Sequence, residues 1–233
     1  MHKSAIPFLC LFILQSSLFC ICPVLAINYN RTVKKADNCS LKFRGKERRA
    51  VKLRTFSDGN TYEVINSGKP ISVTKWHTLV CKLDNDVPYR IPQDFAILNV
   101  ETKKVTIESY ILAAKFKSDE DNDIHAEISD SSDWNTNHII VEVPPGDEYC
   151  IARKALWSII NNDHGVMVND QKILDEPVRI RVTGYIFLDA KKRTEDRCNN
   201  HGGRGLRFGK HTKSRVVGLY EIHPVLELSV VKN

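Results

Sequence analysis

The sequence predicts a mainly β protein: an OB-like five-stranded barrel with one helix between strands 3 and 4, preceded by an N-terminal β or irregular extension. Segments in which apolar and polar residues alternate, the pattern of half-buried strands, recur between residues 104 and 231. One segment with apolar residues at helical spacing lies between the third and the fourth of them. This order of elements is that of the OB-fold, and a β-sandwich is the alternative architecture.

Residues Val105 to Asp130 are expected to form the first hairpin of the barrel. The far half of its first strand is apolar on both sides, as in a strand that is buried on both faces. An acidic turn from Ser118 to Asp123 interrupts the alternation, which then resumes in the second strand. Val105, Ile107, Ser109, Ile111 and Ala113 share one face of the first strand, and Ile124, Ala126 and Ile128 point inward from the second.

The remaining elements are a third strand at His138–Val143, a helix at Glu148–Asn161, a fourth strand at Val178–Asp189 and a fifth strand at Leu219–Val231. Asp147 is expected to cap the helix. Gly184 allows a bend or bulge, and Pro224 demotes one point of the last strand to an edge or a bulge. The residues expected to face the core are Ala152, Ala155, Leu156, Ile159 and Ile160 in the helix, Val178, Ile180, Val182, Ile186 and Leu188 in the fourth strand, and Tyr220, Ile222, Leu226, Leu228 and Val230 in the fifth.

Residues 1–26 are interpreted as a secretory signal peptide. Lys3 provides its positive start, Ile6–Cys22 its apolar core, and Val24–Ala26 the small or apolar residues before cleavage. The alternative is a membrane anchor, for which the apolar run is short. The mature chain is therefore expected to be secreted or periplasmic, to have no transmembrane segment and to contain 233 − 26 = 207 residues.

The chain between the signal peptide and the barrel has weaker patterns. Ile27–Arg49 is polar, basic and without periodicity, and is expected to be a mobile arm. Ala50–Thr55 and Ile71–Cys81 each have short β-like character, and Lys82–Asn99 carries prolines typical of an extended connection. The predicted organisation is thus a signal peptide (1–26), an arm and extension (27–103) and a barrel domain (104–233).

Four cysteines are left in the mature chain: Cys39, Cys81, Cys150 and Cys198. An even number of cysteines in an exported chain favours two disulfides, for which three connectivities are open. A zinc site is the alternative, although the sequence contains no CxxC pair. The expected pairing joins Cys81 to Cys150 and Cys39 to Cys198, so that one bridge ties the N-terminal region to the barrel and the other restrains the loop before the last strand.

A basic segment, residues 190–214, separates the fourth and fifth strands. Its eight lysines and arginines against two acidic residues give a net charge of 8 − 2 = +6, whereas the mature chain has 33 − 28 = +5. In an OB-fold this loop flanks the ligand face, where glycines let a backbone approach a phosphate and an aromatic ring can stack. The alternatives are a solvated insertion and ion pairing with the acidic turn. The predicted binding residues are Arg193, Arg204, Arg207, Phe208, Lys210, His211 and Lys213.

Histidines and carboxylates recur on the outward face of the predicted barrel. Imidazole and carboxylate together suit zinc or another divalent ion, although their spacing matches no known metal motif. No other cofactor is indicated. Residues expected on this face are His125, Glu127, His138, Glu142, Glu221 and His223, of which His125, Glu142, Glu221 and His223 are the predicted metal ligands.

Several short motifs resemble those of a known family. They are Glu101–Thr102, Asp121–His125 leading into Ile128–Asp130, Ile140–Pro144 with Cys150, Val182–Asp189, and Glu221–Leu226. They are similar to the D-x-D-x-H, V-T-G-x-x-F-x-D and E-L-H-P-V-L motifs of a family of exported bacterial proteins of unknown function. The resemblance implies export and fold, and no particular activity. This chain departs from the family in the longer segment between Asp189 and His211.

These patterns favour an exported, non-enzymatic OB-like binding protein. Its expected partner is anionic: a nucleic acid, an acidic glycan, or an envelope or host surface. The alternative is a metal-dependent hydrolase, nuclease-like or phosphodiesterase-like, that uses the His/Glu face. The sequence contains no Gly-x-Ser-x-Gly, Walker or HExxH motif that would indicate another enzyme class.

Overall fold

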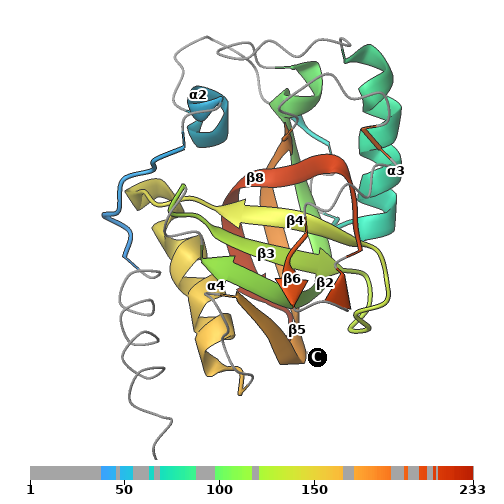
Figure 1. The fold of residues 1–233 in the computed structure, drawn as a ribbon. Helices are drawn as coiled ribbons and strands as arrows, with labels where there is room; N and C mark the ends of the chain where they lie inside the picture. The colour runs from blue at the N-terminus through green and yellow to red at the C-terminus, as the bar shows by residue number, and fades with distance from the viewer. Residues whose placement is uncertain are drawn as a thin grey trace, which may run out of the picture.

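Five strands close into a barrel in the computed structural model of the chain (Figure 1). The structure describes residues 38–45, 48–54, 63–65, 69–87, 98–116, 121–164, 171–189, 197–198, 205–208, 212–213 and 215–232. The barrel strands are β2 (Lys103–Phe116), β3 (Ile124–Ser129), β4 (His138–Val143), β5 (Gln171–Leu188) and β8 (Val216–Val230). Their order is β2-β3-β4-β8-β5, and β5 pairs with β2 to close the ring. This is the predicted OB-like order, with β4 and β8 parallel and the other barrel pairs antiparallel.

The barrel interior is filled by alternate residues of each strand, as the sequence predicts. Ile124, Ala126 and Ile128 of β3 all belong to the hydrophobic core. In β2, however, a bulge between Ile111 and Ala113 shifts the register. The extra residue exchanges the two faces of β2 beyond the bulge. Ala114 and Phe116 therefore face the core, and Ala113 does not.

The last strand shows the same effect. Its register against β5 shifts on both sides of Gly184, which confirms the predicted bulge there. As a result Val225 belongs to the core, whereas Val230, which was expected to point inward, is 52% exposed. The position of a bulge therefore decides which residues of a long strand face the core.

The helix between the third and fourth barrel strands is α4 (Cys150–Asn162), preceded by the 3-10 turn η3 (Asp147–Tyr149). Its predicted apolar stripe packs into the barrel core. The expected cap is wrong: Asp147 lies inside the turn, and no side chain caps α4. Arg153, fully buried, joins the helix to the barrel through the carbonyls of Val143 and Asn122.

Two segments of the N-terminal extension that were expected to be β-like are helical instead: α2 (Arg49–Leu53) and α3 (Val73–Leu83). Ser72 caps α3, and the carboxylate of Asp130, at the end of β3, accepts hydrogen bonds from the first backbone N–H groups of that helix. The two-residue strand β1 (Glu63–Val64) adds to the edge of β2. Figure 1 shows α3 and α4 on opposite sides of the barrel.

The arm expected to be mobile is packed where the structure describes it. Phe43 is only 4% exposed and Arg48 only 6%. The expected extended connection begins instead with the end of α3 and the 3-10 turn η1 (Asp84–Asp86), and its later part lies outside the described residues. A further 3-10 turn, η2 (Asn99–Thr102), leads into β2. The N-terminal extension thus contributes to the same core as the barrel.

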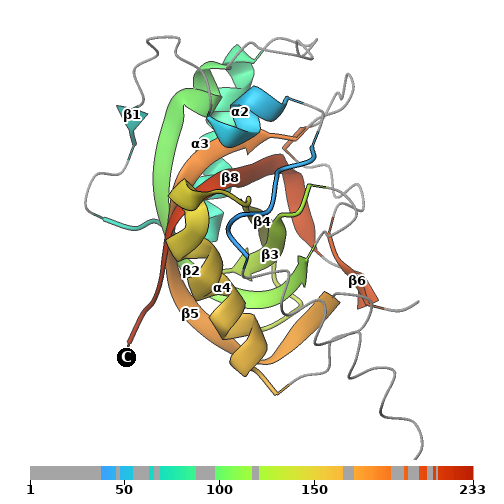
Figure 2. The same ribbon diagram turned by 90° about the vertical axis from the view of Figure 1, so that its left-hand side faces the viewer.

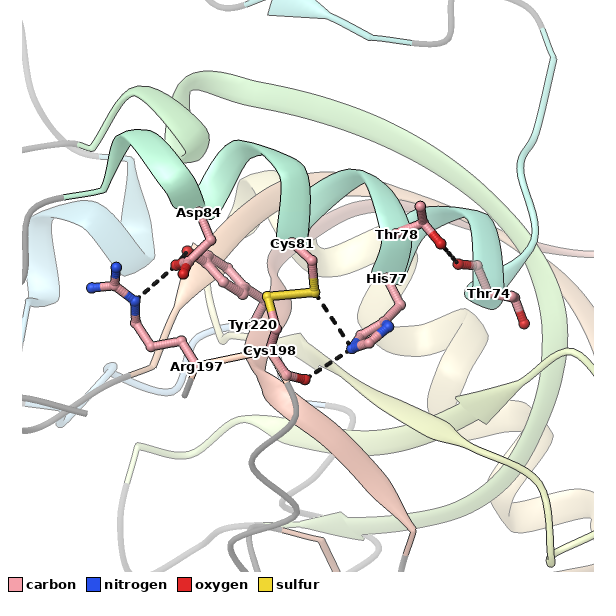
Figure 3. Close-up of a disulfide and its surroundings, with 8 residues drawn as sticks. All are labelled: Thr74, His77, Thr78, Cys81, Asp84, Arg197, Cys198 and Tyr220. Carbon is pink, nitrogen blue, oxygen red and sulfur yellow. Dashed lines mark hydrogen bonds and ion pairs between the residues drawn. A yellow bond between two sulfur atoms is a disulfide. The ribbon is translucent and has the colours of Figure 1, made fainter. Parts of the chain in front are cut away.

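Two disulfides form, as predicted, but with other partners. Cys39 pairs with Cys150 and Cys81 with Cys198, at Cα–Cα distances of 5.2 and 5.5 Å. The first bridge ties the N-terminal segment to the start of α4, and the second ties the basic segment to α3 (Figure 3). The expected roles were correct and the expected partners wrong, because the helical form of residues 73–83 places Cys81 beside Cys198.

Replacing Gly184 with alanine should lower the free energy of unfolding by about 1–3 kcal/mol. An added Cβ would lie 2.5 Å from both Ile222 Cγ2 and the backbone oxygen of Pro224, so β8 would have to move. Urea denaturation of the Gly184→Ala variant measures the loss. An unchanged denaturation midpoint would show that the two strands are farther apart than described.

Candidate metal centre and basic hairpin

Three adjacent strands bring five ionisable side chains together. The order β3-β4-β8 makes these strands neighbours, and the register sets His125 opposite Glu142 and Ile140 opposite Glu221. Since side chains alternate along a strand, the face that is turned away from the core carries the polar residues. The cluster consists of Asp123, His125, Glu142, Glu221 and His223; Asp123 immediately precedes β3.

The two histidines of this cluster meet the carboxylates at hydrogen-bonding distance. His125 Nδ1 lies 2.9 Å from Glu142 Oε1, and His223 Nδ1 lies 2.9 Å from Glu142 Oε2. His223 Nδ1 is also 3.3 Å from Glu221 Oε1, and its Nε2 is 3.9 Å from Asp123 Oδ2. The structure thus brings together all four residues that the sequence singled out as metal ligands.

Asp123 is the member of the cluster that the predicted ligand set omitted. Asp123, Glu142 and His223 each offer one ligand atom, and these atoms lie within 4.8 Å of one another. The Asp-x-His spacing of Asp123 and His125 was the available signal, because residues two apart on a strand share a face. This signal was ambiguous, because Asp123 is equally well explained as the last residue of the predicted acidic turn.

The cluster faces away from the barrel core but not toward solvent. None of its five residues is more than 3% exposed. Two aromatic rings cover it. The Phe43 ring of the N-terminal segment lies 6.4 Å from the His223 ring, and the Phe187 ring of β5 lies 5.6 Å from the His223 ring. The outward face predicted from the sequence is therefore a buried layer between the barrel and the N-terminal segment.

Lys52 of α2 is a cation at the edge of this layer. Its Nζ lies 2.9 Å from Asp121 Oδ2 and 5.6 Å from the centre of the Phe187 ring. Burial lowers the pKa of the Lys52 ammonium, but the surrounding negative charges outweigh it and raise the pKa above its ordinary value. The carboxylates responsible are Glu142, Glu221, Asp121 and Asp123.

The pKa of His223 is raised to about 9. Burial alone would lower it, but the hydrogen bonds to Glu142 and Glu221 and the charge of Glu142 outweigh that effect. The charge of Lys52 acts in the opposite direction. The imidazole is therefore held as a cation by its carboxylate neighbours unless another cation replaces its proton.

A second histidine–carboxylate pair lies on β3 and β4. His138 Nδ1 is 2.7 Å from Glu127 Oε2, and both side chains are fully buried. Its other ring nitrogen lies 3.0 Å from the backbone oxygen of Trp134, and the Leu206 N–H donates to Glu127. Both ring nitrogens of His138 thus have hydrogen-bond partners, whereas Nε2 of His223 has none.

The basic segment is described only in part. Arg193, Arg204, Lys210 and His211 lie outside the described residues. Arg207 and Phe208 form β6 (Arg207–Phe208), which pairs with β7 (Thr212–Lys213) in a two-stranded hairpin with Arg207 opposite Lys213. Figure 2 shows β6 at the side of the barrel away from the C-terminus.

Two described residues anchor the basic segment to the rest of the molecule. Arg197 is buried and bonds Asp84 and the backbone oxygen of Val87, so it has a structural role rather than a ligand-binding one (Figure 3). Leu206 is the second anchor: it is 5% exposed, and its backbone N–H donates a hydrogen bond to Glu127. In the acidic turn, Asp121 pairs with Lys52.

Comparison of the chain with protein-family models, with curated proteins and with solved structures finds no match. Within the described residues, no helix is both long and apolar enough to cross a membrane.

Proposed function

We propose that this chain is an exported, non-enzymatic binding protein for an anionic ligand. The β6–β7 hairpin is the observation that supports it, because an OB-like barrel often grips polymeric ligands with the loop at this position. Two disulfides and the resemblance to an exported family support export. The ligand classes that fit the charge are a nucleic acid, an acidic glycan, and an envelope or host surface.

The charge of the hairpin supports an anionic partner. The register sets Arg207 opposite Lys213, and like charges on directly opposite strand positions destabilise a pair. Paired positions that both carry a cationic residue type are suited to a phosphate, sulfate or carboxylate group. Arg197 is neutralised inside the fold by Asp84, so the cations predicted to meet the ligand are the remaining ones of the segment.

Replacing Arg204, Arg207, Lys210 and Lys213 with alanine should flatten the salt dependence of polyanion binding. Each duplex phosphate that is neutralised contributes about −0.9 to the slope of log affinity against log salt, so four contacts contribute roughly −3.6. Fluorescence titrations with duplex DNA and heparin over a range of salt concentrations measure it. Phe208→Ala should weaken single-strand binding with little change in slope.

A matched control replaces four cations outside the basic segment: Lys75, Lys154, Arg179 and Arg181. All four are exposed, and the change in net charge is the same. This control variant should keep the wild-type slope. Wild-type protein that ignores heparin, DNA and RNA at low salt would refute the proposed function.

A metal-dependent hydrolase is the second candidate, and the observation that favours it is the Asp123–Glu142–His223 cluster. A phosphodiester would have to reach this cluster, yet none of the three residues is more than 2% exposed. Burial therefore favours a binding protein over a hydrolase. Turnover of a phosphodiester substrate that a chelator abolishes would reverse this preference.

A further inference from the structure

The carboxylate and histidine cluster on β3, β4 and β8 has the composition of a cation site. Ligand atoms of Asp123, Glu142 and His223 converge within 4.8 Å. Zinc binds imidazole nitrogen and carboxylate oxygen at about 2.0–2.2 Å, so the three side chains need only a small closing movement to surround an ion.

The His223 ring is an independent indication of a ligand. Its Nδ1 meets the carboxylates of Glu142 and Glu221, whereas its Nε2 is buried, makes no hydrogen bond and points to within 3.9 Å of Asp123 Oδ2. A metal-binding histidine commonly coordinates through one nitrogen and donates its other N–H to a carboxylate, which fixes the ring. His223 already has the second half of that arrangement through Glu221 Oε1, 3.3 Å from its Nδ1, and its side chain is fully buried. Glu142, which also lies near Nδ1, would turn from it to the ion.

His125 extends the same pattern. Its Nδ1 bonds Glu142, and its Nε2 is also buried without a hydrogen bond. Buried ring nitrogens normally find a partner, as both nitrogens of His138 do. Two such nitrogens in one cluster distinguish it from an ordinary buried polar network.

The local charge also favours a cation. Lys52 Nζ lies 2.9 Å from Asp121 Oδ2, and the negative charges of Glu142, Glu221 and Asp123 also act on it. A divalent ion would compensate this excess of negative charge more fully than one lysine does. Such an ion would also repel the Lys52 ammonium, because both are positively charged and both are attracted to the same carboxylates.

We propose that Asp123, Glu142 and His223 bind a zinc-like divalent cation in a closed site, with Glu221 orienting His223 and Lys52 serving as the counter-cation of the ion-free form. The mixed nitrogen and oxygen ligands favour zinc over magnesium or calcium, which prefer oxygen alone. Complete burial indicates a structural ion, which would hold β3, β4 and β8 in one arrangement. The proposal does not depend on the basic segment.

Calorimetric titration of the chelator-treated, disulfide-bonded chain with zinc chloride tests the proposal. The wild type should bind one zinc ion per chain. Glu221→Gln should weaken binding by about 10–100-fold, the usual effect of losing an orienting partner, and His223→Gln by more than that. Lys52→Met should tighten binding by about tenfold or more, since it removes a positive charge from the site.

His138→Gln is the matched control, because it makes the same change in another fully buried histidine–glutamate pair, which lies on β3 and β4 outside the cluster. It should leave zinc affinity unchanged. Near-UV circular dichroism establishes that each variant is folded, and Asp123→Asn, with the same expected loss, replaces His223→Gln if that variant does not fold. Wild-type protein that binds no zinc, equal losses in the two histidine variants, or weaker binding by Lys52→Met would overturn the proposal.

Discussion

Replacing Glu101 with glutamine should lower the free energy of unfolding by about 3–5 kcal/mol, the usual cost of breaking a buried ion pair. Arg48 approaches both carboxylate oxygens of Glu101 at 2.5 Å, and the two side chains are 6% and 0% exposed. Glu101 also accepts hydrogen bonds from the backbone N–H groups of Leu98 and Leu188. Without its charge, the guanidinium of Arg48 is left buried beside neutral partners. Urea denaturation measures the loss.

A surface ion pair gives the control for this prediction. Lys103 bonds Glu63, whose side chain is 65% exposed. Glu63→Gln should change the free energy of unfolding by about 1 kcal/mol or less. The double variant Arg48→Met, Glu101→Leu should recover part of the loss, since it leaves no uncompensated charge. Equal small effects of Glu101→Gln and Glu63→Gln would contradict the buried pair.

The barrel could be predicted from the sequence because its signals are local. Ile124–Ser129 alternates strictly, and His138–Val143 departs from alternation only at Ile140; both strands form with the expected residues toward the core. The faces of β2 could not be predicted beyond Ile111, because the bulge there depends on how β3 and β5 pair with it. Nor could α3, whose cap includes Asp130, far along the chain.

The candidate site likewise has a part that could be predicted from the sequence and a part that could not. His125, Glu142, Glu221 and His223 could be grouped from alternation and strand order alone. Their burial could not, because no local pattern marks the residues that cover them. Phe43 lies in a polar segment without periodicity, and Lys52 lies in a segment that was expected to be β-like but forms α2. Burial changes the chemistry that the group supports, from an open catalytic face to a closed layer that excludes substrate.

Removing the Cys39–Cys150 bridge should cost about 2–5 kcal/mol of the free energy of unfolding. The cysteines are 111 residues apart, and a loop of about 100 residues is at the upper end of that range, near 4.7 kcal/mol, in the chain-entropy model. Cys81 and Cys198 are 117 residues apart, so the same model expects an almost equal loss for the second bridge. Denaturation of the Cys39→Ala, Cys150→Ala variant and of the Cys81→Ala, Cys198→Ala variant measures the two losses.

Single substitutions decide the pairing itself. Cys39→Ala should free the thiol of Cys150, whereas the pairing expected from the sequence would free that of Cys198. Alkylation of the folded variant under non-reducing conditions, followed by peptide mass analysis, identifies the labelled cysteine. Because the bridge joins the covering segment to α4, Cys39→Ala should also increase the exposure of Phe43 and hydrogen exchange in residues 38–45, which Cys81→Ala should leave unchanged. Labelling of Cys198 in Cys39→Ala would refute the described connectivity.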